Sequence, residues 1–174
     1  PSPAAGAKPK GKERMRFEPR KRADAAAVVG GSRALVFAGP SGSGKTTLIA
    51  AAAREAAKAC AGLGRPAARA PVVCVRFGGL TAAASELPAF LFSICCQLAA
   101  AYDAPPPALA EASQLPRRWG EWLSLATEAR PLLLLLDGVD AHLGDSTAAL
   151  RWLPLPQPPP SVRLVLTCDD KALA

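Results

Sequence analysis

The octapeptide GPSGSGKT at residues 39–46 decides how the rest of this sequence is interpreted. The residues before it, 33–38 (RALVFA), form a short apolar run that stops at a glycine, which is typical of a buried β-strand. The residues after it, from 45 to about 61, are rich in alanine and carry their charged side chains on one side, as an amphipathic helix does. The sequence therefore predicts a strand, a glycine-rich loop and a helix in direct succession.

The pattern G-x-x-x-x-G-K-[ST] is that of a phosphate-binding loop, and its residue types suit that task. Glycine adopts backbone conformations that are closed to other residues, so successive N–H groups can turn toward an anion. The helix beginning near Lys45 adds free N–H groups and the positive end of its dipole. Lys45 supplies a charge for the β- and γ-phosphates, Thr46 offers a hydroxyl to Mg²⁺, and Thr47 is placed to donate to the α-phosphate. The residues predicted to bind nucleotide are Gly39, Pro40, Ser41, Gly42, Ser43, Gly44, Lys45, Thr46 and Thr47.

A run of five leucines at 132–136 is followed directly by Asp137. Leucine favours helices, but the length of the run and the proline before it favour a strand that is buried on both faces. The carboxyl ends of neighbouring parallel strands meet at one edge of a sheet, so Asp137 is predicted to reach the Mg²⁺ held by Thr46. Asp140 is predicted to orient or deprotonate the attacking water, although Asp-Gly-Val-Asp is also good turn chemistry.

The rest of the chain alternates between strand-like and helix-like segments. Strands are predicted at 71–77 and 162–168, and helices at 87–102 and 117–129, with one or two helical turns at 147–153. Such alternation predicts an α/β fold with a parallel sheet. We expect a three-layer sandwich of the P-loop NTPase kind, with about four strands in a mainly parallel sheet and helices on both faces.

The 174 residues carry a formal net charge of +7, and residues 1–22 contain eight basic and two acidic side chains. Such a segment cannot bury enough apolar surface to fold, so we expect a disordered basic tail at 1–22 and one domain at 23–174. The charge of the tail is compatible with nucleic acid, an acidic partner or a membrane surface. Phe17 is its only aromatic residue, so base stacking is not indicated. We interpret the tail as a solvated linker.

Cysteine content and hydropathy argue against several classes of protein, namely disulfide-rich, zinc-binding and membrane-spanning ones. The five cysteines are odd in number and include no C-x-x-C pair, so neither a disulfide framework nor a zinc site is expected. Free thiols fit a reducing compartment, and we expect a cytoplasmic protein. The longest uncharged apolar stretch, 87–102, is shorter than the ~20 residues of a membrane-spanning helix, so no membrane span is expected. We also expect the domain to be incomplete at its C-terminal end.

Two segments together, GPSGSGKT at 39–46 and LLLLLDGVD at 132–140, resemble the NACHT-type branch of the STAND P-loop NTPases. In that branch a small residue follows the metal-binding aspartate and a second acid comes two positions later, as Gly138 and Asp140 do here. A typical AAA+ protein carries an acid directly after that aspartate. The resemblance spans about residues 30–170, with softer similarity to the nephrocystin and NACHT–WD-repeat groups at 73–80, 150–154 and 162–167.

The resemblance implies the nucleotide-binding core of a signal-transducing NTPase that uses ATP and Mg²⁺ and hydrolyses the γ-phosphate slowly as a switch. Lys45, Asp137 and Asp140 are then catalytic, and Thr46 and Asp137 hold the metal. The resemblance favours ATP over GTP, and no Asn/Thr-Lys-x-Asp motif for reading guanine occurs in the sequence. The resemblance also implies protein partners bound through C-terminal repeats, and self-association.

Three alternatives stay open at this point. Many members of the branch carry Ser-Arg where this chain has Cys168 and Asp169, so a scaffold that binds nucleotide without hydrolysing it is the first. An AAA+ or origin-recognition-like ATPase acting on DNA is the second, with the basic tail as its only support. A P-loop kinase acting on a small molecule is the third, although no lid sequence is evident.

Overall fold

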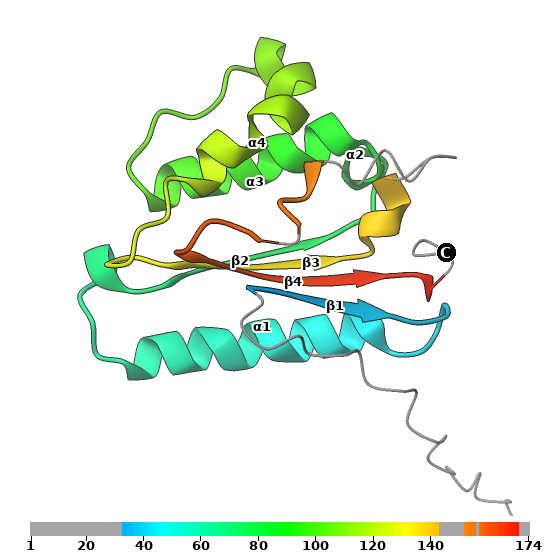
Figure 1. The fold of residues 1–174 in the computed structure, drawn as a ribbon, viewed down its shortest axis with the longest axis horizontal. Helices are drawn as coiled ribbons and strands as arrows, with labels where there is room; N and C mark the ends of the chain where they lie inside the picture. Colours follow the sequence, from blue (N-terminus) through cyan, green and yellow to red (C-terminus); the bar gives the residue numbers. More distant parts are fainter. Residues whose placement is uncertain (1–32, 143–151, 156, 171–174) are drawn as a thin grey trace, which may run out of the picture.

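Figure 1 shows the computed structural model of the chain, in which residues 33–142, 152–155 and 157–170 are described. The strands predicted from the sequence are present to within one residue at each end. The basic tail expected at 1–22 and most of the helical turn expected at 147–153 lie outside the described residues. The strands are β1 (Ala34–Ala38), β2 (Val72–Phe77), β3 (Leu132–Asp137) and β4 (Val162–Cys168).

The strand order in the sheet is β1-β4-β3-β2, and each neighbouring pair is parallel. β4 therefore lies between β1, which leads into the glycine-rich loop, and β3, which ends at Asp137. Because neighbouring strands lie about 4.8 Å apart, the carboxyl ends of β1 and β3 are separated by roughly 10 Å. The loop and the aspartate thus meet at the same edge of the sheet, with the end of β4 between them.

Helices cover both faces of the sheet (Figure 1). The long helix α1 (Lys45–Gly62) packs against one face, and contacts β2, β3 and β4. The other face is covered by α3 (Leu87–Ala101) and α4 (Leu115–Leu123), with the short helix α2 (Ala82–Ser85) beside α3. Three layers with a parallel central sheet make up the α/β architecture of a P-loop NTPase, as the sequence predicts.

Side chains of each strand alternate between the two faces of the sheet. The even-numbered leucines of β3, together with Leu164 and Leu166 of β4, belong to the main hydrophobic core under α3 and α4. The odd-numbered residues of the same strands therefore face α1, and among them are Asp137 and Thr167. The main core also holds Phe90, Ile94, Cys95 and Leu98 of α3 and Trp119 and Leu123 of α4.

The helix predicted at 117–129 is wrong at both ends. α4 starts at Leu115, directly after a 3-10 helix η2 (Leu109–Gln114), and it ends at Leu123. It ends early because residues 127–130 form a tight turn of their own, in which the Thr127 side chain accepts a hydrogen bond from the Arg130 N–H at 3.1 Å. That turn redirects the chain into β3.

All five cysteines are free. Burial raises the pKa of the Cys74 thiol to about 11 and that of Cys95 to about 12, so both stay protonated at neutral pH. Both thiols belong to the core, where Cys95 acts as a small apolar group and the Cys74 thiol also donates a weak hydrogen bond to Gln97 Oε1 at 3.3 Å. In the part of the chain that the structure describes, no helix is both long and apolar enough to cross a membrane.

Candidate nucleotide-binding site

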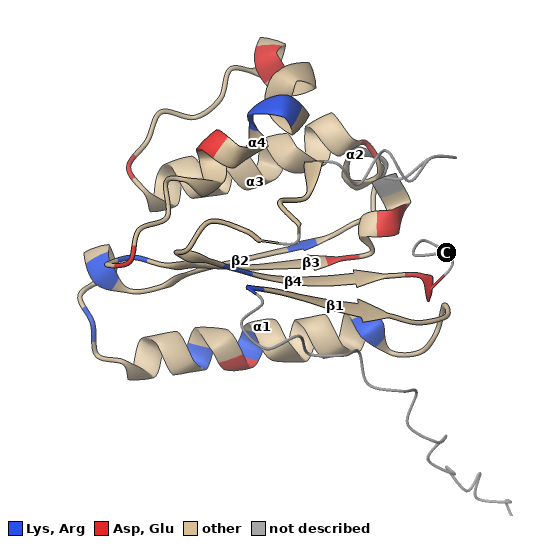
Figure 2. Ribbon diagram, in the orientation of Figure 1, with Lys and Arg blue, Asp and Glu red and all other residues tan. Residues whose placement is uncertain are grey.

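A pocket of about 420 Å³ opens at the carboxyl edge of the sheet. It brings together most of the residues that the sequence predicts for nucleotide binding and catalysis. Figure 2 shows one basic residue at the start of α1 and acidic residues at the end of β3 and after β4, all at this edge. Its lining residues are Ser41, Gly42, Gly44, Lys45, Thr46, Thr47, Gly78, Leu80, Asp137, Gly138, Asp140, Thr167 and Asp169.

The glycine-rich loop has the backbone shape expected of an anion-binding loop. Gly42 and Gly44 have φ angles of 77° and 92°, a region that favours glycine. The Ser43 N–H donates to Pro40 O at 3.2 Å, which closes the loop, and the Gly39 N–H donates to Cys168 O at 3.3 Å, which ties the loop to β4. Gly44 caps α1 without a side-chain hydrogen bond, so no side chain of the loop occupies the first N–H groups of the helix.

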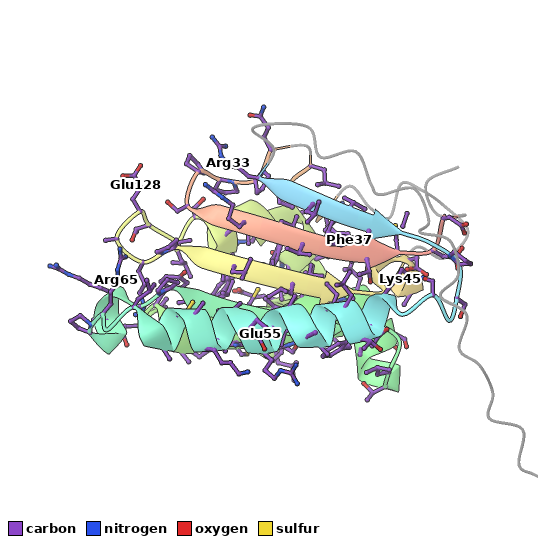
Figure 3. All side chains as sticks on the ribbon, turned by 90° about the horizontal axis from the view of Figure 1, so that it is seen from below. Arg33, Phe37, Lys45, Glu55, Arg65 and Glu128 are labelled. Carbon is purple, nitrogen blue, oxygen red and sulfur yellow. The ribbon has the colours of Figure 1, made fainter. Side chains whose placement is uncertain are left out.

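Gly39, Pro40 and Ser43 were predicted to bind nucleotide, but they do not line the pocket. They shape the loop instead, and two of them hold Lys45. The Lys45 Nζ donates to Gly39 O at 2.5 Å and to Pro40 O at 3.0 Å. The oxygens of a phosphate accept stronger hydrogen bonds from an ammonium group than neutral carbonyl oxygens do. A phosphate bound in the loop would therefore compete with Gly39 O and Pro40 O for Lys45. Lys45 is visible at the start of α1 in Figure 3.

Asp137 and Thr46 meet as the sequence predicts. The Thr46 Oγ1 donates to Asp137 Oδ2 at 2.6 Å, which joins the first turn of α1 to the end of β3. Asp137 is only 5% exposed, so its carboxylate is largely shielded from water and is hydrogen-bonded by neighbouring side chains instead. A hydroxyl and a carboxylate side by side at the pocket wall are a suitable pair of oxygen ligands for Mg²⁺.

Thr167 is a residue of this site that the sequence analysis missed. It is fully buried in β4, its Oγ1 donates to Asp137 Oδ1 at 2.5 Å, and the Gly138 N–H donates to the same Oγ1 at 2.9 Å. The signal that identified Asp137, a polar residue near the carboxyl end of an apolar strand, applies equally to Thr167. Only Asp137 was assigned a role from its place in the sequence, because it carries a carboxylate and Thr167 does not.

Asp140 lies in a 3-10 turn, η3 (Val139–His142), and lines the pocket. Its charge also acts on the buried Cys168 thiol. Burial raises the pKa of Cys168, the negative charge of Asp140 raises it further, and the positive charge of Lys45 lowers it. Asp140 and Lys45 both line the pocket. The structure therefore places Asp140 both in the 3-10 turn and at the wall of the pocket.

Two glycines pack against each other at the back of the pocket. Gly78 follows β2, and its N–H donates to Asp137 O at 2.8 Å. A Cβ atom added at Gly78 would lie 2.5 Å from Gly138 O and 3.1 Å from Asp137 O. Gly138 itself has a φ of 63°. The residue after Asp137 is therefore held in a conformation that favours glycine.

We expect the substitution Gly78→Ala to lower the free energy of unfolding by about 1–3 kcal/mol, because the new methyl group overlaps backbone atoms that cannot move aside. Chemical denaturation monitored by circular dichroism measures the change. Gly62→Ala is the matched control, since a Cβ at Gly62 meets nothing within 4 Å. Equal stability of the two variants would contradict the close packing of Gly78 on Gly138.

The residues present suit a nucleotide with its magnesium ion. In the described part of the chain, no three Asp, Glu, His or Cys side chains come together in a way that could hold a metal by themselves. Mg²⁺ is usually coordinated by one or two protein oxygens together with substrate phosphates and water. The oxygens of Thr46 and Asp137 are suitable for such coordination. Lys45 and the loop N–H groups are donors of the kind that phosphate oxygens accept from.

A comparison with protein families agrees with this geometry. The AAA ATPase domain family matches residues 22–166 of the chain. The chain is also similar to a chain in the structure of Drosophila ORC bound to AT-rich DNA and Cdc6, with 21% identity and a TM-score of 0.45. That match covers 78% of this chain and 39% of the other. No protein of curated function matches significantly. Since the family match includes both motifs and all four strands apart from the last two residues of β4, the chain belongs to the AAA ATPase domain family.

Proposed function

We propose that this domain binds ATP with Mg²⁺ and hydrolyses it slowly, as the switch module of a signalling or scaffold NTPase. The observation that supports this most strongly is the contact between Thr46 and Asp137, 2.6 Å apart, beside Lys45 and the glycine-rich loop. The pocket contains the kinds of group that bind a magnesium nucleotide in other P-loop proteins: N–H donors and an ammonium group for the phosphates, and a hydroxyl and a carboxylate for the metal.

The roles of the residues follow from their positions. The loop N–H groups and the start of α1 bind the phosphates, and Lys45 exchanges its bonds to Gly39 O and Pro40 O for bonds to the β- and γ-phosphates. Thr46 and Asp137 would hold Mg²⁺, which when bound would neutralise part of the phosphate charge.

Asp140 accepts a proton from the attacking water. The water oxygen forms a bond to the γ-phosphorus, the bond from that phosphorus to the bridging oxygen breaks, and ADP leaves with the electron pair.

The NACHT-type spacing of the two acids also belongs to this proposal. In a chain of the typical AAA+ pattern the acid stands directly after the metal-binding aspartate. Here that position is Gly138, with a φ of 63° and its carbonyl oxygen against Gly78. An acidic side chain at 138 would be strained, and Asp140 is the next acid that reaches the pocket. ATP as the nucleotide, protein partners bound through further repeats, self-association and an intracellular location rest on the same resemblance.

A scaffold that binds nucleotide without turnover is the second candidate function. Among the lining residues that the structure describes, Lys45 is the single cation, and Asp169 adds a third carboxylate next to Asp137 and Asp140. Transition-state charge on the γ-phosphate is usually stabilised by more positive charge than one lysine provides. Phosphate release separates the two candidates, because both bind Mg-ATP and only the first turns it over.

Titration calorimetry with ATP and with GTP, each with Mg²⁺ and with EDTA, followed by phosphate release, tests the proposal. We expect Mg²⁺-dependent binding of ATP. For Asp140→Asn we expect ATP affinity within about twofold of the wild type and phosphate release lower by roughly 100-fold, since a general base contributes about that factor. Glu128→Gln is the control, because Glu128 lies at the opposite end of the molecule from Lys45 (Figure 3). Binding without Mg²⁺ dependence, or release unchanged in Asp140→Asn, would contradict the assigned roles.

A further inference from the structure

We propose that Thr167 is a positioning residue for the metal site: it fixes the orientation of the Asp137 carboxylate and thereby sets the Mg²⁺ concentration that nucleotide binding requires. This inference rests on the proposed function and deepens it. Thr167 is among the residues that line the pocket, but it is 0% exposed and both hydrogen bonds of its hydroxyl group are made to Asp137 and Gly138, so its effect on nucleotide passes through these two residues.

The sheet topology brings Thr167 to this place. β4 lies between β1 and β3, and Leu166 of β4 pairs with Leu136 of β3. The next residue on each strand, Thr167 and Asp137, therefore lies side by side at the carboxyl edge. Both face α1, because Leu136 and Leu166 belong to the core on the opposite face. Thr46 in the first turn of α1 completes the group.

The hydrogen bonds of Thr167 have only one possible direction. The Gly138 N–H is a donor, so it occupies a lone pair of Thr167 Oγ1 at 2.9 Å and leaves the hydroxyl proton free. That single proton is donated to Asp137 Oδ1 at 2.5 Å. Thr46 donates to the other oxygen, Oδ2. Rotation of the carboxylate about its side-chain bonds would break one or both of these contacts, so Oδ2 is kept on the side of Thr46.

A purely packing role would be filled better by valine, which has the same shape and no hydroxyl. Burying a hydroxyl group is unfavourable unless it is hydrogen-bonded, and both hydrogen bonds of Thr167 are made to Asp137 or to the residue after it. Partners that orient a metal-binding carboxylate from behind typically change metal affinity by 10- to 100-fold when they are removed. Thr167 has this relation to Asp137.

Thr167→Val and Thr167→Ser test the inference together. We expect Thr167→Val to raise the Mg²⁺ concentration for half-maximal ATP binding roughly tenfold or more, and Thr167→Ser to restore the wild-type value, because serine keeps the hydroxyl. Affinity for ATP in EDTA should be the same in all three proteins. In ligand-free protein we expect the Gly138 amide to exchange faster with solvent in Thr167→Val, since its acceptor is gone.

The outcomes are distinct. If the wild type binds Mg-ATP and Thr167→Val needs no more Mg²⁺ than the wild type does, the positioning role is overturned and the proposed function stands. If Thr167→Val loses affinity equally with Mg²⁺ and with EDTA, the residue serves packing and the positioning role is again overturned. If the folded wild type binds no Mg-ATP, both proposals fail. Thermal melting of each variant confirms that folded protein is compared.

Discussion

Replacement of Lys45 by alanine should weaken ATP binding by roughly 100-fold, about 3 kcal/mol, while the domain stays folded. The side chain leaves α1 at its first residue, and its ammonium already lies over the loop, 2.5 Å from Gly39 O and 3.0 Å from Pro40 O. Removing it takes away the single cation that lines the described pocket. Stability should change little, because the two carbonyl oxygens it bonds are accessible to water in its absence. Titration calorimetry with ATP and Mg²⁺ measures the effect.

Lys58→Ala is the matched control for Lys45→Ala. It removes the same charge from the same helix, but Lys58 is exposed and pairs with Glu55 at 3.1 Å, far along α1 from the loop. Exposed pairs of this kind contribute little, so Lys58→Ala should bind ATP like the wild type. Equal losses in the two variants would mean that net charge, and not the position of Lys45, governs binding, and the nucleotide pocket would then be assigned wrongly.

Trp119→Ala should cause the largest loss of stability, about 3–5 kcal/mol in the free energy of unfolding. Trp119 of α4 is 2% exposed and packs edge-to-face on Trp152, with ring centroids 6.1 Å apart, and Trp152 packs in the same way on Phe90 of α3 at 6.3 Å. Alanine leaves a cavity at the point where α3, α4 and the segment before β4 meet. Urea denaturation followed by circular dichroism measures the loss.

Trp119→Phe separates cavity formation from polar burial. The indole N–H of Trp119 is buried without a hydrogen-bond partner among the described residues, so phenylalanine keeps an aromatic ring and removes an unsatisfied donor. We expect Trp119→Phe to lower the free energy of unfolding by roughly 1–2 kcal/mol, well below the loss in Trp119→Ala. If the two variants were equally unstable, ring packing in this cluster would not be the source of its stability.

The strands were predictable because each has a local signature. Residues 132–136 and 162–168 are short apolar runs bounded by proline or polar residues, and such runs fit a strand that is buried on both faces. The glycine-rich loop was predictable for a similar reason, since its chemistry is contained in eight consecutive residues. The contact between Thr46 and Asp137 required one further rule, that parallel strands end at the same edge of the sheet.

The parts that were not predictable depend on distant contacts. The end of α4 is set by a turn at 127–130 that the helical pattern of Trp119 and Trp122 does not reveal. The strand order depends on contacts between distant segments. No local sequence pattern therefore indicated that the end of β4 would lie beside Asp137. Thr167 was overlooked for this reason, although its place in its own strand matches that of Asp137 in β3.

The position of β4 also has a mechanical consequence. Two successive residues at its end are fastened to the two halves of the pocket: Cys168 O accepts the Gly39 N–H of the loop, and Thr167 holds Asp137. The backbone then passes the pocket at Asp169. A force applied to the chain after β4 would therefore act at the same time on the glycine-rich loop, through Cys168, and on Asp137, through Thr167. In the same way, a nucleotide that drew the loop and Asp137 together would act on both contacts and therefore on the end of β4.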